Sequence, residues 1–424
     1  MFIGDLFIYY LSFALIILIR FGRSAFLFEI DRHFLPFLLL YITSIFIFYI
    51  SGLYDIYKIK PIIPNLKTYI ISLSILFIIA IIFFYFIPFF GITPKTNLLY
   101  QIIGYGILSF IIRRLIYNLY SSSIYKPVIL VGNTNYMAEI SKTIKDNPQI
   151  GLKIISEVES YTKIDPEFLS KKDLVLIIEN NMREINQEEI IFLYKRNVEV
   201  IDITKAYEKY LFKIPIDYIT QTWIIENINV NNNSPLNFIM RFFDILLSIF
   251  VLLLVSPVLL ITAIFIYLGD NGNIFYTQER VGLNGKRFIF YKFRSMIMQA
   301  ETKEAIWAKE NDTRITKVGK IIRKLHIDEI PQMINILKGD MALVGPRPER
   351  PDFVKILEDK IPNYGLRHII KPGFTGWAQI KYRYARTEAD SKDKFEYDLY
   401  YIKNKNIFMD MGIVLRTIQI IFTH

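Results

Sequence analysis

The sequence predicts a membrane protein of α plus α/β class, with a transmembrane helical bundle, a Rossmann-like domain, a membrane-embedded helix and a mainly helical C-terminal domain. Three observations support this class. Of the 424 residues, 53% are hydrophobic, and the mean hydropathy of +0.32 is high for a soluble protein. Long apolar runs fill most of the first 112 residues. Short apolar strands alternate with helical segments after residue 125.

The first domain, residues 1–122, is predicted to be a four-helix transmembrane bundle. The loop at 54–67 carries three lysines and the third loop only Lys95, so the positive-inside rule puts both ends of the bundle in the cytoplasm. Arg20 and Arg23 in the first loop argue mildly for the opposite orientation. No ionisable residue lies in the middle of a run, so the bundle is interpreted as an anchor and not as a transport path. The four apolar runs are residues 2–19, 34–53, 68–90 and 98–112. The first three are near the ~20 residues that a membrane span requires.

Residues 123–230 are predicted to form the Rossmann-like domain, with a parallel, doubly wound sheet. Such sheets often bind dinucleotides through a G-x-G-x-x-G turn. Here the turn begins at Gly132 and lacks the other glycines, so a structural or regulatory fold without a cofactor is favoured over a bound nucleotide. Residues 231–235 then mark a linker. The alternation consists of strands near 128–131, 153–157, 174–178 and 198–201, with helices near 137–145 and 187–196.

The next hydrophobic segment, residues 238–269, is long enough to cross a membrane but carries Ser256-Pro257 near its centre. A central proline removes a helical hydrogen bond and kinks the helix, and the Ser256 hydroxyl could bond the carbonyl group that is freed. A fifth crossing, the commoner use of such a segment, would place the charged C-terminal domain, residues 270–424, outside the cell. We therefore predict a re-entrant helix that bends at Ser256-Pro257 and returns to the same face, with Arg241 and Asp244 paired at its mouth.

Two adjacent carboxylates, Asp328 and Glu329, are followed by Pro331, which is tolerated only in the first turn of a helix. A helix is therefore predicted to begin within two residues of Asp328. The positive potential at its N-terminus favours anions and would help to keep an aspartate ionised. A stiff turn at 345–348 follows and presents Arg347. This combination indicates metal-assisted phosphoryl chemistry, whereas an isolated Asp-Glu pair would more simply be an N-cap with a surface salt bridge.

Basic side chains surround this stretch in the sequence. A strand is predicted over 288–296, on which Lys292 and Arg294 face the same way and are available to a phosphate; ordinary solvated charge is the alternative. Arg280 and Arg323 are further candidates for phosphate binding. With 50 Lys and Arg against 40 Asp and Glu, the net charge is +10, which suits anionic lipids and nucleotide phosphates. Nucleic acid is disfavoured because so much of the chain is apolar, and the absence of cysteine excludes disulfides and thiolate metal sites.

Taken together, the motifs of the C-terminal half resemble those of bacterial polyprenyl-phosphate sugar-1-phosphate transferases, in particular the large bipartite members of the monotopic phosphoglycosyl transferase superfamily. The resemblance is strong over residues 238–424 and looser over the bundle and the Rossmann-like domain. His326 departs from the small hydroxylic residue usual at its position, a change that we expect to be tolerated. The motifs, which occur in this order in the family, are the Ser-Pro hairpin and residues 291–296, 328–332, 345–348 and 372–377.

The resemblance implies a two-step reaction on a UDP-sugar, with UDP-glucose or UDP-galactose as the favoured donor. Asp328 would attack the sugar-proximal phosphorus and expel UMP, and undecaprenyl phosphate would then attack the phosphosugar held on the enzyme. An Mg2+ held by Asp328 and the diphosphate would neutralise charge, and Glu329 would orient or deprotonate the acceptor phosphate. The arginines that bind phosphate in the family match Arg323 and Arg347, the latter next to Pro346.

The same resemblance implies a bacterial inner membrane protein with a cytoplasmic catalytic domain that begins the assembly of a surface polysaccharide: an exopolysaccharide, a capsule or a lipopolysaccharide. Its partners would be the UDP-sugar, polyprenyl phosphate and the lipid bilayer. A homodimer stays open, as do the sugar and the glycan. Three rival hypotheses remain: a nucleotide-sugar oxidoreductase or dehydratase that uses NAD on the middle domain, a catalytically inactive scaffold for glycan assembly, and a single-step transferase without a covalent adduct.

Overall fold

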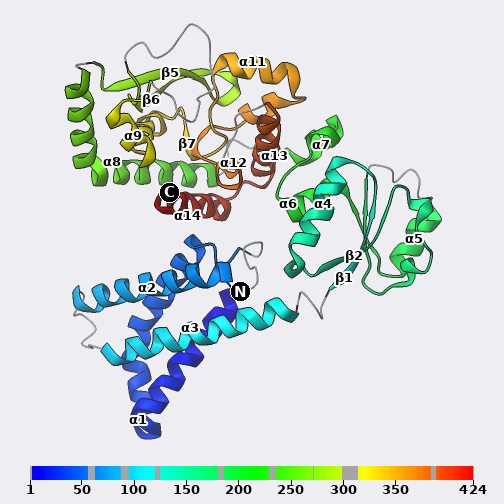
Figure 1. Cartoon of the computed structure of the whole chain (residues 1–424), viewed down its shortest axis with the longest axis horizontal. Coiled ribbons are helices and arrows are strands. Elements are labelled where there is room, and N and C mark those ends of the chain that lie inside the picture. Colours follow the sequence, from blue (N-terminus) through cyan, green and yellow to red (C-terminus); the bar gives the residue numbers. More distant parts are fainter. Residues whose placement is uncertain are drawn as a thin grey trace. The chain divides into compact units, whose positions relative to one another are not determined.

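A computed structural model gives the fold of the chain, which divides into two units, Met1–Ala206 and Tyr207–His424 (Figure 1). Each unit is described by itself. The linker predicted at 231–235 lies outside the described residues except for Pro235. The structure describes residues 2–55, 63–86, 95–119, 125–179, 186–228, 235–270, 272–297, 314–382 and 388–423.

The N-terminal part of the first unit is a bundle of apolar helices. Its first element, α1, bends at Gly22, whose φ of 72° is outside the helical range, so the element consists of two successive helices. These two helices correspond to the first two predicted runs. Counted as single elements, α1, α2 and α3 are three of the four described helices that are long and apolar enough to cross a membrane. The loop lysines Lys58 and Lys60 lie outside the described residues. The bounds are α1 Phe2–Ile50, α2 Ile63–Phe86 and α3 Lys95–Asn118.

Ionic contacts hold the bundle together near the ends of its helices. The helix α3 continues past Arg113, which turns inward, forms an ion pair with Asp5 and donates to the Leu53 carbonyl at 2.6 Å. Arg20 and Asn97 join the first and third elements by a second hydrogen bond. Asp5, Arg20 and Arg113 thus have partners within the bundle, as expected for charge at the margins of an apolar environment.

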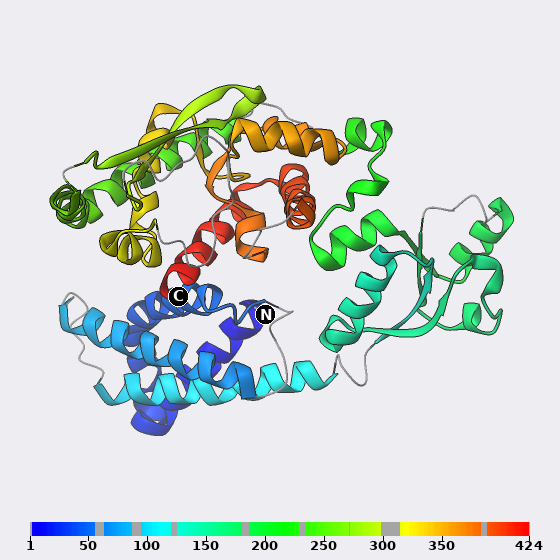
Figure 2. The same ribbon diagram turned by 45° about the horizontal axis from the view of Figure 1, so that its top comes forward.

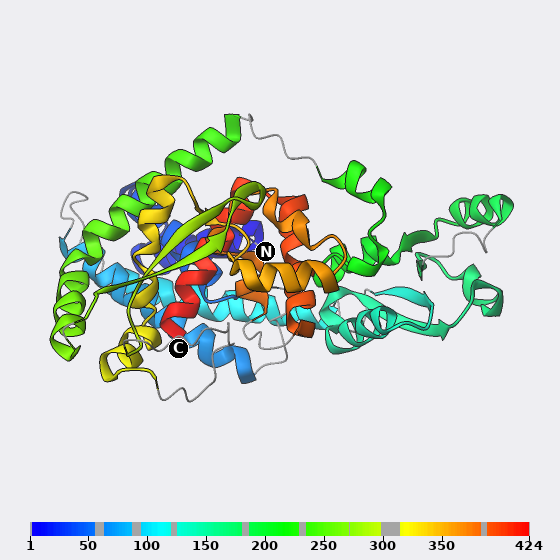
Figure 3. The same ribbon diagram turned by 90° about the horizontal axis from the view of Figure 1, so that it is seen from above.

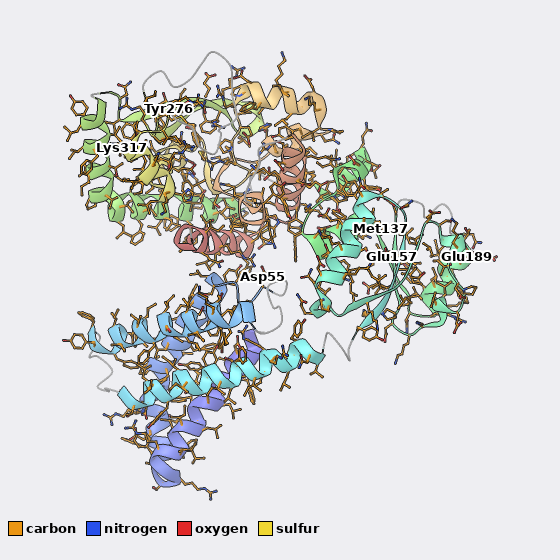
Figure 4. All side chains as sticks on the ribbon, in the orientation of Figure 1. Asp55, Met137, Glu157, Glu189, Tyr276 and Lys317 are labelled. Atoms are coloured by element: carbon orange, nitrogen blue, oxygen red, sulfur yellow. The ribbon has the colours of Figure 1, made fainter. Side chains whose placement is uncertain are left out.

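The second part of the first unit is a four-stranded parallel sheet in the order β2-β1-β3-β4. The predicted strands and both predicted helices are confirmed. The inner strands β1 and β3 are almost wholly buried, which is typical of parallel sheets covered on both faces. Figure 4 labels Met137 on α4, Glu157 on β2 and Glu189 on α5. The bounds are β1 Lys126–Val131, α4 Asn135–Asp146, β2 Leu152–Val158, β3 Val175–Ile178, α5 Gln187–Lys195, β4 Glu199–Asp202 and α6 Ile203–Leu211.

The second unit combines a β-hairpin with short helices (Figure 2). The strand predicted over 288–296 is confirmed as β6, whereas its partner β5 was not predicted. The Asn284-Gly285 turn between them is a hairpin signal that could have revealed β5. The bounds are α7 Gln221–Asn227, α8 Pro235–Asp270, β5 Phe275–Val281, β6 Arg287–Phe293, α9 Lys317–Lys324, α10 Gln332–Lys338, β7 Ala342–Val344, α11 Pro351–Lys360, β8 Gly373–Thr375, α12 Trp377–Lys381, α13 Glu388–Asn404 and α14 Ile407–Thr423.

Helix α8 contains the predicted Ser-Pro break. It bends, and its two straight stretches can be followed from above in Figure 3. Pro257 frees the carbonyl of Leu253, and the Ser256 hydroxyl donates to that carbonyl at 2.8 Å, as predicted. Both stretches pack on the same unit: Leu252 before the proline contacts the core around Met333, and Leu259 after it contacts the core around Phe293. Among the outward-facing residues, Leu253, Leu254 and Leu260 are all at least 66% exposed.

The predicted pairing of Arg241 with Asp244 is wrong. Arg241 donates to the carbonyls of Ile336 and Leu337 at 2.6 and 3.0 Å. Asp244 accepts from the Leu343 N–H at 3.1 Å. Both side chains therefore satisfy unpaired backbone groups, at the C-terminal end of α10 and beside β7, where they contribute more than a mutual surface pair would. They fix the first stretch of α8 to the second unit.

The last helix, α14, has apolar side chains on two sides. On α14, Ile413 is fully buried and Val414 packs against the same core. Met411 and Ile418 are 51% and 37% exposed, and Phe408, one turn earlier, is 81% exposed. One side of the helix thus belongs to the domain core, while the other presents apolar side chains outward.

Candidate active site

The acidic pair lies where one helix stops and the next begins. Helix α9 ends at Lys324, and His326 then adopts a φ of 54°, in the left-handed region that histidine tolerates better than most residues. A single 3-10 turn, η10, covers Ile327–Glu329, and Pro331 caps the N-terminus of α10. The helix that was predicted to begin within two residues of Asp328 begins later, because this 3-10 turn occupies the predicted start and α10 itself begins at Gln332. The proline stands just before α10, where its missing N–H costs nothing.

Glu329 is held by two cations. Arg347 donates to it through both terminal nitrogens, with Nη2–Oε1 at 2.6 Å and Nη1–Oε2 at 3.3 Å. Lys292, on β6, places Nζ 2.8 Å from Oε1. The side chain of Glu329 is 17% exposed. In such a setting, charge-assisted hydrogen bonds are short and strong, and the fork of an arginine fits a carboxylate in one geometry.

The electrostatics of this cluster follow from burial and from the charges within it. Burial alone would raise the pKa of Glu329, but the charges of Arg347 and Lys292 hold it well below its usual range. The Glu329 carboxylate in turn raises the pKa of Arg347. Burial lowers the pKa of Lys292, and the charge of Glu329 opposes that change. Glu329 is therefore ionised, saturated with hydrogen bonds and a poor proton acceptor.

Asp328 differs from Glu329 in its hydrogen bonding and in the direction in which its pKa is shifted. It is buried, with 7% of the residue exposed, and its side chain forms no hydrogen bond or ion pair with any other residue that the structure describes. Burial raises its pKa, and the charge of Lys292 offsets this only in part. The prediction that the helix start favours the ionised form is corrected on this point, because desolvation outweighs the favourable charges. Among the described residues, Asp328 is thus a carboxylate without a partner, next to one that accepts three hydrogen bonds.

The turn at 345–348 is fixed from several sides. Arg280 donates from Nη1 to the Pro348 carbonyl at 3.1 Å, and the Pro346 carbonyl accepts from the Gly373 N–H at 2.9 Å. A Cβ added at Gly345 would collide with the backbone of residues 371–373. The Gly/Pro motif at 372–377 thus supports the Arg347 turn by close contact between backbones.

The structure adds Arg367, which sequence reasoning missed. Its Nη2 donates to the Arg347 carbonyl at 2.9 Å and to Asp398 Oδ2 at 3.0 Å. Arg367 and Asp398 are both buried, and burial raises the pKa of Asp398 to about 6 although the charge of Arg367 opposes it. No local pattern marks these residues, because they meet the turn only through tertiary contacts.

The remaining predicted residues lie at different distances from the acidic pair. Arg323, half-buried in the last turn of α9, is near enough for its charge to lower the pKa of Asp328, and it makes no hydrogen bond or ion pair with another described residue. Arg294 pairs with neither Asp328 nor Glu329 among the described residues; its backbone N–H donates to the Ile274 carbonyl. Arg280 acts on the 345–348 turn. The structure therefore brings Asp328, Glu329, Lys292 and Arg347 together, with Arg323 beside them.

The donor set fits a magnesium ion that receives most of its ligands from a substrate. In the described parts of the chain no group of three or more His, Asp, Glu or Cys side chains is arranged to hold a metal. Mg2+ is commonly bound through one or two carboxylates together with phosphate oxygens and water. Of the two carboxylates of this site, Asp328 is the one whose oxygens are not bonded to another residue in the described part of the chain.

A second helix start, in the α/β domain, is closed by the chain itself. Glu179, at the end of β3, accepts from the N–H groups of Asn133 and Thr134 at 3.1 and 3.3 Å and from the Thr134 hydroxyl. This is the turn that holds a pyrophosphate in dinucleotide-binding sheets. Gly132 has a φ of 146°, and a side chain at this position would collide with Glu179. A carboxylate of the protein thus occupies the anion position.

Comparison with known proteins finds similarity to bacterial sugar transferases, and the matching family model lies within the second unit. The family model described as "Bacterial sugar transferase" matches residues 236–424. The "UDP-N-acetylgalactosamine-undecaprenyl-phosphate N-acetylgalactosaminephosphotransferase" of Aeromonas hydrophila is 47% identical over 186 residues, 44% of this chain and 44% of that protein. The "UDP-glucose:undecaprenyl-phosphate glucose-1-phosphate transferase" of Escherichia coli (strain K12) is 41% identical over 179 residues, 41% of this chain and 38% of that protein.

A shorter relative is matched over most of its length. The "Uncharacterized sugar transferase EpsL" of Bacillus subtilis (strain 168) is 41% identical over 179 residues, which are 42% of this chain and 85% of that protein. The chain spans less than half of the two longer relatives. The shared segment contains α8 and all residues of the acidic cluster.

Proposed function

The chain belongs to the bacterial sugar transferase family through residues 236–424, and from this membership we propose that it transfers a sugar-1-phosphate from a UDP-sugar to undecaprenyl phosphate. The products are undecaprenyl-diphosphate sugar and UMP. The names of the Aeromonas hydrophila and Escherichia coli relatives support undecaprenyl phosphate as the acceptor. The observation that carries the proposal is the contrast between a buried Asp328 with no partner among the described residues and a Glu329 held by Arg347 and Lys292.

In the proposed reaction Asp328 is the nucleophile. A carboxylate oxygen of Asp328 bonds to the sugar-proximal phosphorus, the bond from that phosphorus to the bridging oxygen breaks, and UMP leaves with the electron pair. A phosphate oxygen of the acceptor then bonds to the same phosphorus, and the aspartyl oxygen leaves as a carboxylate. Two displacements divide one difficult step into two. The free oxygens of Asp328 support this role, because a carboxylate already held by cations would be a weaker nucleophile.

Glu329 is proposed to orient the cations and not to accept a proton. Its depressed pKa makes it a poor base, which argues against the deprotonating role that the sequence left open. By fixing Arg347 and Lys292 it holds positive charge where phosphate oxygens arrive. Arg323, without a partner among the described residues, is available to a phosphate. Mg2+ would be held by Asp328 and the diphosphate and would neutralise the charge of the phosphates.

The membrane arrangement is part of the proposal. Both stretches of α8 pack on the same unit while its outward leucines are exposed, which supports a helix that enters the bilayer and returns to the side from which it came. We propose that this side is the cytoplasm, where the positive-inside rule puts both ends of the bundle. A site at membrane level would then receive the acceptor phosphate from the lipid and the UDP-sugar from solution.

The donor is proposed to be a UDP-hexose or its N-acetylamino form, because the printed names of the relatives include glucose, galactose and N-acetylgalactosamine. The closed turn at Glu179 argues against the rival in which the α/β domain uses NAD. The product would be the first lipid-linked intermediate of a surface polysaccharide.

The test measures turnover and the covalent adduct together. Full-length protein in lipid nanodiscs receives a panel of UDP-sugars with undecaprenyl phosphate and Mg2+, and UMP release is measured. A donor labelled in the sugar is then supplied without acceptor. We expect label to remain on the protein after denaturation, and Asp328→Asn to abolish both the label and turnover.

Asp352→Asn, at an exposed position on α11, is the matched control and should keep both. Label that never stays with a wild-type protein that turns over would support the single-step transferase. A folded wild-type protein that releases no UMP from any donor would support the inactive scaffold.

A further inference from the structure

Asn335 replaces a strand along one edge of β6. It lies on α10 and is completely buried, with 0% exposure. Its Oδ1 accepts from the Tyr291 N–H at 3.1 Å, and its Nδ2 donates to the Ile289 carbonyl at 2.6 Å. A carboxamide offers one acceptor and one donor face, as a peptide group does. Asn335 therefore bonds to β6 much as the backbone of a neighbouring strand would.

This contact lies next to the acidic cluster in the sequence and in space. Lys292 directly follows Tyr291, and its Nζ is 2.8 Å from Glu329 Oε1. Three links thus join β6 to residues 328–338. Asn335 bonds to the backbone of β6, Lys292 bonds to Glu329, and Lys338 Nζ donates to the Tyr291 hydroxyl at 2.7 Å. Successive side chains of a strand point to opposite faces, so a shift of β6 by one residue would turn Lys292 away from Glu329.

We propose that Asn335 is a positioning residue of the transfer reaction, which holds β6 in register with the Asp328–Glu329 segment so that Lys292 stays on Glu329 and leaves Asp328 free. The inference rests on the proposed function. Lys292 is already close enough to influence Asp328 by its charge. If β6 were released, the ammonium group could pair with Asp328 and occupy the oxygens that must reach phosphorus.

The sharpest variant is Asn335→Asp, which keeps the shape of the side chain. A carboxylate keeps the acceptor for Tyr291 but repels the Ile289 carbonyl, and it also faces Asp340, whose Oδ2 is 3.5 Å from Asn335 Nδ2. We expect kcat near neutral pH to fall between about tenfold and about 100-fold, because small displacements of catalytic groups have effects of this size. KM should change less, since substrate contacts remain.

Lowering the pH should rescue this variant. A protonated carboxyl group has one donor and one acceptor, as the carboxamide has. Burial against a carbonyl raises the folded-state pKa of the new acid above its unfolded value, so the destabilisation is present at high pH and is lost as the pH falls through the folded pKa. The ratio of variant to wild-type kcat and the difference between their melting temperatures should both recover toward wild type.

Leu357→Ala is the control for lost stability alone. Leu357 is buried in a separate core with Ile214 and Phe395. We expect this variant to melt earlier but to keep kcat at temperatures where it is folded, with a ratio to wild type that does not depend on pH. An Asn335→Asp variant that behaves like Leu357→Ala, or that keeps full kcat, would overturn the inference.

A readout without turnover separates this inference from the proposed function. Amine acylation at Lys292, followed by mass spectrometry, reports whether the lysine is held by Glu329. In Asn335→Asp we expect faster acylation of Lys292 near neutral pH and an unchanged rate at the exposed Lys145. Unchanged acylation of Lys292 would overturn the positioning role even if the transferase is active. Faster acylation in a protein without transferase activity would leave the register role standing and remove the proposed function.

Discussion

Two helix starts in this chain both carry acidic side chains, but these side chains are bonded differently. At the start of α4, the Glu179 carboxylate accepts from two backbone N–H groups and a hydroxyl, and the Thr134 side chain accepts from the Met137 N–H at 3.4 Å. At η10, the carboxylate of Glu329 binds both nearby cations, and the adjacent Asp328 has no partner among the described residues. The first start is closed by the protein, and the second keeps one buried acidic group open.

The difference shows what separates a structural helix start from a reactive one. An anion at a helix N-terminus is stabilising wherever it comes from, so residue type alone does not indicate a ligand. A buried polar group without a partner is costly and is retained where function requires it. This criterion supports the proposal that Asp328 is the reactive member of its pair, and it favours a structural role for the Gly132 turn of the α/β domain.

The largest effect after loss of the nucleophile is expected at Arg347. Arg347→Ala removes the two arginine donors to Glu329, leaving only Lys292 bonded to it, and one of the charges proposed to face the phosphates. We expect kcat to fall by about 100-fold to about 1000-fold, the usual consequence of deleting a preorganised electrostatic contact. Arg347→Lys should recover only part of the loss, because a lysine keeps the charge but not the two-pronged geometry. UMP release by the folded variants measures both.

Equal rates for Arg347→Lys and wild type would contradict the importance of the fork. The two helix starts would then differ only in charge, and the comparison would weaken.

A moderate effect is expected on the acidic limb of the pH profile. Activity should fall as the pH falls through the raised pKa of Asp328, because only the ionised form attacks phosphorus. In Glu329→Gln a negative neighbour is lost and its two cations are released, so the pKa of Asp328 should fall and the acidic limb should move to lower pH. The maximal rate should also fall, since Arg347 and Lys292 lose their anchor. An acidic limb that stays in place would show that Asp328 does not control it.

Much of the fold could be predicted because each domain has a clear pattern of apolar residues along the sequence. The parallel sheet follows from strand and helix alternation, and all four of its predicted strands are present. Ser256-Pro257 was correctly predicted as a break with its own hydroxyl partner. In these cases the signal and the structure involve neighbouring residues, so the sequence contains both.

The candidate site could be predicted only in part. Asp328, Glu329, Lys292 and Arg347 were found as residue types, but which carboxylate takes the cations depends on tertiary distances. The Arg241–Asp244 pair failed for the same reason, since each residue found a stronger partner in the backbone of α10 or β7. Asn335 and Arg367 were missed because their partners lie 20 to 46 residues away in the sequence.

A smaller effect is expected in the α/β domain. Glu179→Gln keeps the size of the side chain but loses the charge that faces the backbone N–H groups at the start of α4. We expect the domain to lose about 1 kcal/mol of unfolding free energy, the usual value for such contacts. Hydrogen exchange of the Asn133 and Thr134 amides should quicken, while UMP release should be unchanged. A variant with lower turnover at full stability would give this turn a role in the reaction.

The smallest effect is expected at a carboxylate that differs from Glu179 only in its surroundings. Glu157 accepts from Lys145 at 2.7 Å, but the two side chains are 46% and 60% exposed. Solvent and salt screen such a pair. Glu157→Gln should therefore change the unfolding free energy by less than about 0.5 kcal/mol, and high salt should remove the difference. If Glu157→Gln lowered the unfolding free energy as much as Glu179→Gln does, a carboxylate at a helix start would be no more stabilising than one in an exposed ion pair. The closed and open starts would then have to be distinguished by burial alone.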